Sequence, residues 1–312
     1  MAKLFPIFRG TAGLNNRIDP ARIRFDQKTF IQELAIAVNV VVDDSYRLTR
    51  RKGQTPTAIT SSCHSLFPYR SVCMAVIGSS LCVLDAGLNP TVIASVNSDA
   101  HMSYETVMEL VYYCNGYDNG IINLNTMSRS DWVKDTGDYV GPITSRQFQS
   151  PDVAGYMLAY YKGRLYMPTV DQGFPVVWYT EPNSFNWVDF AQNYLPFESQ
   201  VRMFRPVRDG IFVSTDTEVF FLLGDEPVAA FEHIHISDYP AIEGTDVIVP
   251  GSRVRDGRII GEAVIWTTEQ GICIGAPGGD FNNLTANKIR LPTGFNRGSA
   301  VYYDGTYTVT LY

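Results

Sequence analysis

The stretch LAYYKGRLYMP, residues 158 to 168, decides the fold. Two short runs of apolar and aromatic residues flank Lys162-Gly163, a pair that can adopt the positive φ angles of a tight β-hairpin turn. The same unit recurs along the chain as CMAVIGSSLCVLD, YYCNGYDNGIINL, RPVRDGIFVST, IWTTEQGICIG and VYYDGTYTVTLY. This repetition predicts a chain built almost entirely of β-hairpins.

The spacing of the hairpin glycines predicts the architecture. Six of them are separated by 42, 43, 47, 61 and 34 residues: Gly78, Gly120, Gly163, Gly210, Gly271 and Gly305. A four-stranded propeller blade takes about 40 to 50 residues. A further hairpin in AVNVVVDDSYRLTRR (37–51), with its turn at Asp43-Asp44-Ser45, would make a seventh unit.

We therefore expect an all-β chain that forms a six- or seven-bladed β-propeller over residues 31–312, preceded by an extended N-terminal arm over residues 1–30. A long β-sandwich or two stacked β-domains would show the same alternation and glycine turns, and the repeat favours the propeller. The segment SYETVMELVYY (103–113) has the period of either a helix or a strand. Its β-branched and aromatic residues favour a strand.

Composition narrows the class of protein. The 312 residues carry a formal charge of −7, which argues against binding nucleic acid over the whole surface and leaves local basic patches open. The five cysteines have no Cys-x-x-Cys spacing, so we expect reduced thiols in a protein assembled in cytoplasm. No apolar run reaches the roughly 18 residues of a membrane span, and we expect neither a signal peptide nor a membrane anchor.

The sequence gives little support for a catalytic or metal-binding site. His233 and His235 would share one face of a strand and could present two imidazoles to a metal ion, but the alternating Ile234 and Ile236 favour a solvent-facing strand instead. The chain has no Gly-x-Ser-x-Gly elbow and no phosphate-binding Gly-Lys-Ser/Thr loop. Paired carboxylates such as Asp216 with Glu218 are typical of turns and solvated strands. We expect no enzyme activity, no cofactor and no metal.

Two segments near the N-terminus are better candidates for interactions. The arm KLFPIFRGTAGLNNRIDPARIRF (3–25) is apolar and rich in arginine, and Pro6 and Pro20 interrupt strand pairing, so we expect a neighbouring subunit to hold it. RLTRRKG (47–53) makes the first 53 residues basic while the rest is acidic. Such a patch can contact DNA phosphates or an acidic protein ring, although charge that protects a solvated strand edge explains it equally well.

The candidate interaction residues come from these two segments. They are Leu4, Phe5, Phe8, Arg9, Leu14, Asn15, Asn16, Arg17, Arg22, Arg24, Arg47, Arg50, Arg51 and Lys52.

The segment GLNNRIDPARIRFD, followed by IQELAIAVNVVVDDSYRLTRRKG, resembles the N-terminal signature of tail hub or nozzle proteins of short-tailed phages, including the packaged-DNA stabilisation proteins. The resemblance covers Gly13 to Gly53, and beyond it extends only to a general propeller pattern. It implies a virion protein, assembled in the bacterial cytoplasm, that forms a ring of identical subunits, usually six, beneath the portal and adaptor. Such a ring continues the DNA channel and helps to retain packaged DNA, without sequence-specific binding.

Two other functions stay open from the residues. Trp178, Tyr179, Trp187, Tyr302 and Tyr303 could form an exposed aromatic platform, typical of a receptor- or carbohydrate-binding propeller at a tail tip. A propeller glycosidase that uses carboxylates in a central pocket is the third hypothesis.

Overall fold

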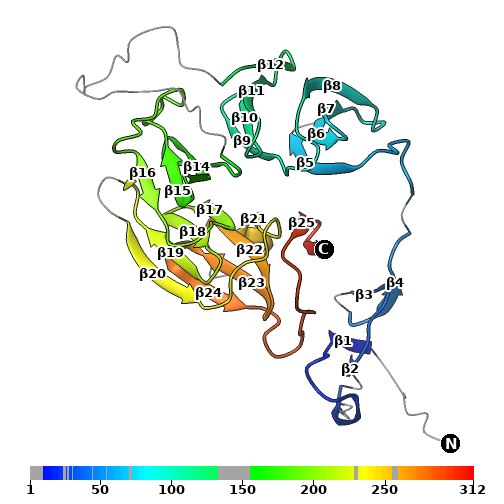
Figure 1. Ribbon diagram of the computed structural model, residues 1–312. Coiled ribbons are helices and arrows are strands. Elements are labelled where there is room, and N and C mark those ends of the chain that lie inside the picture. Colours follow the sequence, from blue (N-terminus) through cyan, green and yellow to red (C-terminus); the bar gives the residue numbers. More distant parts are fainter. Residues whose placement is uncertain are drawn as a thin grey trace, which may run out of the picture.

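The computed structural model describes residues 10–23, 26, 28–29, 31–43, 45–53, 55–69, 72–132, 155–227, 231–254 and 259–312. Five four-stranded antiparallel sheets follow one another around a common centre (Figure 1). The fold is a β-propeller, as the sequence predicts. The number of blades, six or seven, stays a prediction.

Each four-stranded sheet is built from consecutive strands, in chain order from one edge to the other. The first sheet contains β5 (Cys63–Tyr69), β6 (Val72–Ile77), β7 (Ser80–Leu84) and β8 (Pro90–Ser95). The second contains β9 (Ser103–Val107), β10 (Leu110–Cys114), β11 (Asn119–Asn123) and β12 (Ser128–Ser130). The third contains β13 (Ala159–Tyr161), β14 (Arg164–Asp171), β15 (Phe174–Tyr179) and β16 (Tyr194–Pro196).

The fourth sheet contains β17 (Met203–Val207), β18 (Gly210–Ser214), β19 (Val219–Leu223) and β20 (Glu232–Ser237). The fifth contains β21 (Val247–Pro250), β22 (Glu262–Thr268), β23 (Gly271–Ala276) and β24 (Asp280–Asn283). The first strand of each sheet lies toward the centre, where β13 contacts both β9 and β17, and the fourth strand lies outside (Figure 1).

Three two-stranded sheets complete the described strands. β25 (Gly298–Tyr303) pairs antiparallel with β26 (Thr306–Leu311) next to β21 and forms a sixth, smaller unit. β1 (Gly10–Leu14) pairs in parallel with β2 (Ile31–Leu34), and β3 (Val40–Val42) pairs antiparallel with β4 (Leu48–Arg50). Short 3-10 helices are η1 (Pro20–Arg22), η3 (Gly251–Arg253) and η4 (Pro277–Gly279). We call residues 10–53 the N-terminal lobe and residues 63–312 the body.

Two predictions about the N-terminal region are wrong. The hairpin in residues 37–51 exists as β3 and β4, but it lies outside the ring of sheets beside β1 and β2, so it is not a blade (Figure 1). The predicted boundary between residues 30 and 31 is also wrong, because Gly10 pairs with Ile31 and Thr11 pairs with Gln32 across it. The four-stranded sheets begin only at β5, after the lobe has ended.

The hairpin turns follow the predicted chemistry, with exceptions at Gly120 and Gly210, which lie inside strands and have no positive φ. Lys162 and Gly163 have φ angles of 47° and 80° and close the turn between β13 and β14. Gly120, however, lies inside β11, where an added Cβ would come within 2.5 Å of the Tyr113 Oη. The turn between β10 and β11 is instead formed by residues 115–118, where Gly116 has a φ of 88°. The turn Met108-Glu109, with Met108 at a φ of 57°, divides the segment 103–113 into two strands. Glycine spacing located this sheet but mistook a packing glycine for a turn glycine.

Large side chains fill the spaces between consecutive sheets. Phe212 of β18, Phe221 of β19 and Trp266 of β22 are fully buried in one cluster between the fourth and fifth sheets. The Phe212 ring centroid lies 5.6 Å from that of Trp266. Burial of aromatic side chains between sheets is the main stabilising contribution to such a ring. The body is therefore held by packing between neighbours.

Candidate functional site

The N-terminal lobe is attached to the rim of its own propeller. Asn16 forms a reciprocal pair with Arg290: its Nδ2 donates to the Arg290 carbonyl at 2.9 Å, and the Arg290 N–H donates to its Oδ1 at 2.7 Å. The Arg17 guanidinium donates to the carbonyls of Ile289 and Gln270, each at 3.1 Å. These bonds hold Asn16 and Arg17 against their own chain, and the expectation that a neighbouring subunit holds the arm stays a prediction.

Other predicted arm residues build the lobe itself. Asn15 is buried, and its Nδ2 donates to Glu33 Oε2 at 2.6 Å. Glu33 also pairs with Lys288 of the body at 3.2 Å. Leu14 pairs with Leu34 in the small parallel sheet, and Arg22 ends η1 with an exposed side chain. Five predicted residues lie outside the described residues: Leu4, Phe5, Phe8, Arg9 and Arg24.

The basic hairpin is held by a carboxylate-capped turn. Asp43 Oδ1 accepts hydrogen bonds from the backbone N–H groups of Ser45 at 2.8 Å and Arg47 at 2.9 Å. This is the structural role that turn carboxylates usually have. The cap fixes the register of β3 against β4 and thereby places Arg50 and the residues after it at the end of the hairpin.

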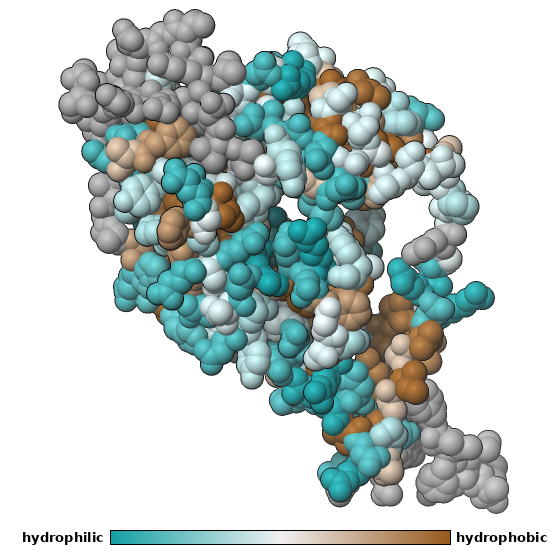
Figure 2. Space-filling model, in the orientation of Figure 1, coloured by the Kyte–Doolittle hydropathy of each residue, from teal (hydrophilic) through white to brown (hydrophobic). Residues whose placement is uncertain are grey.

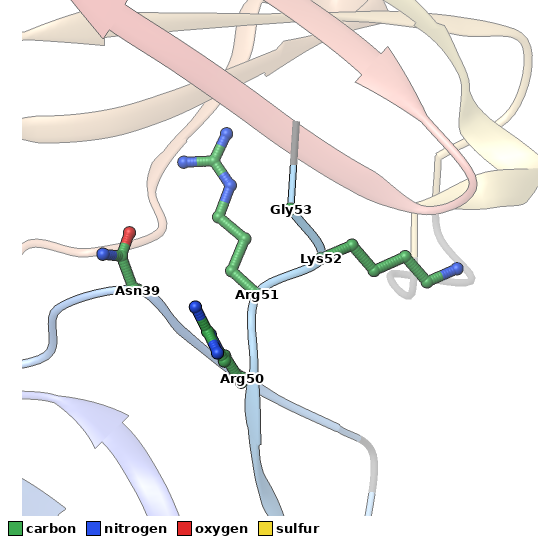
Figure 3. A pocket seen from close by; sticks show the side chains of 5 residues that line it. All are labelled: Asn39, Arg50, Arg51, Lys52 and Gly53. Atoms are coloured by element: carbon green, nitrogen blue, oxygen red, sulfur yellow. The ribbon is translucent and has the colours of Figure 1, made fainter. Parts of the chain in front are cut away.

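Arg50, Arg51 and Lys52, together with Asn39 and Gly53, line an open cavity of about 320 Å³. Figure 3 shows the Arg51 and Lys52 side chains extending in different directions from the backbone. All three cationic side chains are exposed. Such an arrangement presents positive charge over a broad surface and does not enclose a small ligand.

The cations of the lobe and those of the body differ in their partners. Among the described residues, no carboxylate forms an ion pair with the hairpin cations Arg47, Arg50, Arg51 and Lys52. Six described body arginines do have carboxylate partners: Arg129, Arg164, Arg202, Arg205, Arg208 and Arg297. Residues 1–53 hold ten Lys and Arg against five Asp and Glu, while the remaining 259 residues hold 15 against 27. A cationic lobe thus adjoins an acidic body.

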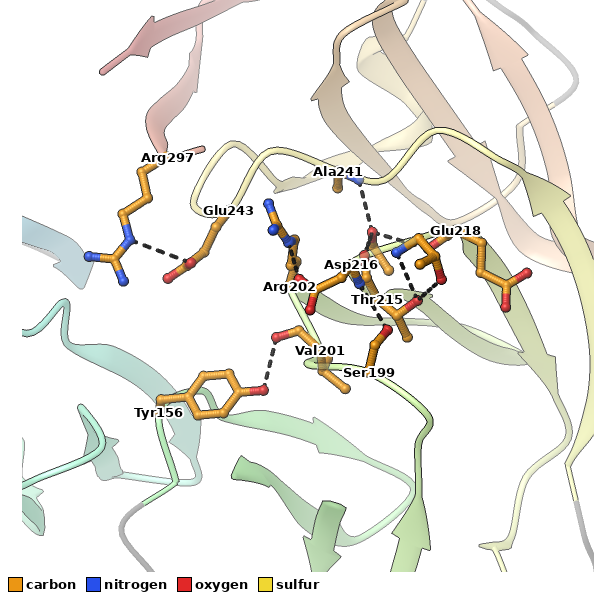
Figure 4. Close-up of polar contacts among 12 residues, drawn as sticks. Tyr156, Ser199, Val201, Arg202, Thr215, Asp216, Glu218, Ala241, Glu243 and Arg297 are labelled. Carbon is orange, nitrogen blue, oxygen red and sulfur yellow. Dashed lines mark hydrogen bonds and ion pairs between the residues drawn. The ribbon is translucent and has the colours of Figure 1, made fainter. Parts of the chain in front are cut away.

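Polar residues and ion pairs surround the centre of the propeller (Figure 4). Arg202 pairs with Asp216 at 2.5 Å, and Arg297 pairs with Glu243 at 3.5 Å. Arg205 of β17 pairs with Asp246 at the start of the fifth sheet. The Asp216 carboxylate, which the sequence analysis assigned to a turn or a solvated strand, is therefore engaged in an ion pair.

Glu105 of β9 lies among the same inner strands. Burial raises the pKa of its carboxyl to about 7, and Glu262 adds to the increase while Arg205 opposes it. Loss of hydration penalises the charged form of a carboxyl group, which accounts for the direction of this shift.

The solvent-facing interpretation of the HIH motif is confirmed. Ile234 and Ile236 pack against the buried cluster that contains Trp266, while His233 and His235 are exposed on the other face of β20. His235 Nε2 lies 3.0 Å from Asp238 Oδ1. In the described part of the chain, no group of three or more His, Cys, Asp or Glu residues is placed to hold a metal ion. No described helix is long and apolar enough to cross a membrane.

Sequence reasoning missed a cluster formed by the other two histidines. The rings of His64 and His101 lie 5.2 Å apart, and His101 Nε2 is 2.9 Å from the Tyr312 Oη. Burial lowers the pKa of His101, and nearby His64 and Arg297 lower it further. This cluster connects the end of β26 to the first two sheets. No local pattern could have located it, because the contacts depend on closure of the ring.

The predicted aromatic platform is not exposed. Trp178, Tyr179 and Trp187 have exposed fractions of 8%, 3% and 7% and lie in the packing between sheets. Tyr302 packs against the apolar cluster of the fifth sheet, and its Oη donates to the Arg253 carbonyl. Only Tyr303 of the five is largely exposed, at 80%. The feature that motivated a carbohydrate-binding propeller is therefore absent at four of its five positions.

Among known proteins, only solved structures are similar to this chain. No family model and no curated protein matches the chain. The Pan2 WD40 domain of Neurospora crassa is similar at 10% identity and a TM-score of 0.40, covering 69% of this chain and 61% of that domain. Hsv2 of Kluyveromyces lactis is similar at 12% identity and a TM-score of 0.44, covering 85% and 81%. A structure of BBS1N in complex with ARL6DN gives 12% identity, a TM-score of 0.49, and coverage of 87% and 84%.

The chain thus spans less than two thirds of the Pan2 domain. Likeness at these identities and TM-scores carries no information on what this chain binds.

Proposed function

We propose that this chain is a structural subunit of a phage tail hub or nozzle, which assembles head to tail into a ring around a DNA channel. The observation that supports this most directly is the separation of charge. An exposed cationic hairpin without carboxylate partners among the described residues stands on one side of a body with 15 basic and 27 acidic residues. The resemblance of residues 13–53 to the tail hub proteins supports the same function.

Charge separation of this kind favours contact between unlike surfaces of identical copies. Two basic lobes repel each other, so an isologous contact through the lobes is disfavoured, whereas the lobe of one copy attracts the body of the next. A heterologous contact that repeats with a fixed rotation closes a ring. An acidic wall around the channel would let DNA pass, because phosphates are not bound by it. The role is structural, and no bond is made or broken.

The partners in this proposal are further copies of the chain, the portal and adaptor, and the packaged DNA in the channel. Its place is the tail of the virion, after assembly in the cytoplasm of a bacterial host.

The proposal is tested by the mass of the protein in solution as salt is varied. We expect light scattering to show multiples of the 34.8 kDa chain at low salt and weaker association at high salt. The variant Arg50→Ser/Arg51→Ser/Lys52→Ser should weaken self-association by about tenfold or more, because it removes the attraction to the neighbouring body. A monomer under every condition contradicts the proposal.

A matched control removes three exposed cations from the body. Lys162→Ser/Arg208→Ser/Arg253→Ser changes the net charge by the same amount, and all three side chains are exposed. We expect this variant to associate at least as well as the parent. Equal weakening by both triple variants would mean that net charge, and not the hairpin, governs association.

A further inference from the structure

The sixth unit of the propeller has two strands where each of the five complete sheets has four. β25 occupies the inner position, next to β21, and β26 takes the second position. Tyr302 and Tyr307 anchor the pair against the cluster that contains Val249 and Ile265. The third and fourth positions of this unit are filled by no strand of the described chain.

The outer edge of β26 carries backbone groups that point away from β25. In a hairpin with the two-residue turn Asp304-Gly305, the flanking pair Tyr303 and Thr306 exchanges hydrogen bonds, and so does every second pair after it. The N–H groups of Tyr307, Val309 and Leu311 therefore point outward. No described strand pairs with them.

This edge lacks the features that protect the other outer strands from pairing. The outermost strand of each complete sheet contains a proline or a charged residue, and three of these five strands are only three or four residues long. β8 begins at Pro90 and β16 ends at Pro196, while the charged residues are Arg129 in β12, Glu232 in β20 and Asp280 in β24. β26 has the sequence TYTVTL over six residues, with no charge, no proline and no bulge in its register. An edge of this kind is a template for an additional strand.

The chain also contains a hairpin with a free edge. Asp43 and Arg47 are hydrogen-bonded across the turn, as are Asn39 and Arg51, so the N–H groups of Leu48 and Arg50 point away from β3. Apolar side chains gather on the same lobe in Figure 2, and six of them are exposed: Ile18, Ile36, Val38, Val41, Tyr46 and Leu48. A two-stranded hairpin with exposed apolar side chains can fill the two missing positions.

The hairpin of the same copy does not occupy this position. Hydrogen bonds from Asn16 and Arg17 to residues 289 and 290 hold the lobe on the rim. Figure 1 shows β3 and β4 beside β1 and β2 and apart from β25. A second copy of the chain carries the same hairpin on a lobe that projects from its own body, where it can reach a neighbour.

We propose that β4 of a second copy of this chain adds to the outer edge of β26, so that the neighbour's hairpin completes the sixth sheet in the order β25, β26, β4, β3. Each copy then donates one hairpin and accepts one, which is the heterologous contact that closes a ring. The inference rests on the proposed function in that both require self-association, and it identifies the surface through which the copies join.

The test uses one donor variant and one acceptor variant of the full chain. Leu48→Pro removes an outward N–H of β4, and Val309→Pro removes an outward N–H of β26, while neither N–H takes part in its own hairpin. We expect light scattering to show a monomer for each variant alone. An equimolar mixture should form a heterodimer of twice 34.8 kDa, because it contains one intact edge of each kind.

The mixture also controls for folding, since a misfolded variant cannot restore association. Leu48→Ala and Val309→Ala truncate the same side chains but retain the edge N–H groups, and both should associate within about threefold of the parent. Proline variants that associate as well as the parent would overturn the strand addition and leave the ring proposal intact. A parent that stays monomeric would overturn both.

Hydrogen exchange of the parent gives a measurement that does not depend on the proline variants. In the associated state, exchange of the Tyr307, Val309 and Leu311 amides should slow by about tenfold or more relative to dilute monomer. Unchanged exchange at these three amides in an associated sample would place the contact elsewhere and overturn the proposal.

Discussion

The body and the N-terminal lobe are built on different principles. In the body, large apolar side chains such as Trp266 are fully buried between sheets, and six of the described arginines have carboxylate partners. In the lobe, the sheets have two strands each, six large apolar side chains are exposed, and the hairpin cations have no ion-pair partner among the described residues. The body therefore depends on packing between sheets, whereas the lobe leaves charge and apolar surface exposed.

Truncation of apolar side chains should give the largest difference in stability loss between the body and the lobe. Trp266→Ala should lower the free energy of unfolding by about 3–5 kcal/mol, since it leaves a cavity in the cluster between the fourth and fifth sheets. Leu48→Ala, at a side chain that is 43% exposed, should change it by less than about 0.5 kcal/mol. Urea denaturation followed by tryptophan fluorescence or circular dichroism measures both. Similar losses for the two variants would mean that the lobe is part of the folding core.

Glycine substitutions sharpen the same contrast at the level of the backbone. A Cβ at Gly210 would overlap the Phe221 ring and the Leu222 carbonyl, whereas a Cβ at Gly53 meets nothing within 4 Å. Gly210→Ala should destabilise the protein by about 1–3 kcal/mol, and Gly53→Ala by less than about 0.5 kcal/mol. Midpoints of urea unfolding give both values. A tolerated alanine at Gly210 would show that the fourth sheet can shift to accommodate it.

The pH dependence of stability tests the partly buried carboxyl of Glu105 in the body. Burial raises the pKa of Glu105 from its ordinary 4.5 to about 7 in the folded protein, so between these two pH values the folded state keeps a proton that the unfolded state has released. Stability from this group is therefore present at low pH and is lost as the pH rises toward 7. Glu105→Gln should raise the free energy of unfolding at pH 8 by about 1 kcal/mol and leave it unchanged at pH 4.

Glu269→Gln, which removes an exposed turn carboxylate of the body, is the matched control for this series. A parallel gain at pH 8 in both variants would assign the effect to net charge and not to the burial of Glu105.

The smallest effect is expected where the lobe meets the body. Arg17→Met removes hydrogen bonds to exposed carbonyls, so the free energy of global unfolding should change by less than about 0.5 kcal/mol. Cleavage at Tyr46 by chymotrypsin should nevertheless become severalfold faster, because the lobe is less firmly held. Arg22→Met, at an exposed residue of η1, is the control. Unchanged cleavage in Arg17→Met would show that Asn16 and Glu33 hold the lobe without it.

Much of the fold could be predicted from the sequence because hairpin turns are local. Lys162-Gly163 and Asp304-Gly305 have the predicted positive φ angles, and the segment 103–113 is β. The predictions failed where residues distant in sequence decide the structure. β1 pairs with β2 across an intervening 3-10 helix, and Gly120 is needed for space under Tyr113 and not for a turn.

The candidate site could be predicted only in part, for the same reason. The basic residues of the hairpin were found because charge and turn residues are visible locally. The attachment of Asn16 and Arg17 to residues 270–290 was not, since it joins the two ends of the chain. Trp178, Tyr179 and Trp187 were misassigned to an exposed surface, because composition alone does not distinguish an aromatic binding face from packing between sheets.

The central claim, that the lobe of one copy contacts the body of another, is tested most directly by zero-length cross-linking. A carbodiimide joins the exposed amine of Lys52 to a carboxylate in contact with it, in a mixture of ¹⁴N- and ¹⁵N-labelled full-length chains. We predict that mass spectrometry will find Lys52 cross-linked to body carboxylates in peptide pairs of mixed isotope composition. If Lys52 cross-links only within pairs of one isotope, the lobe contacts its own body and the claim is wrong.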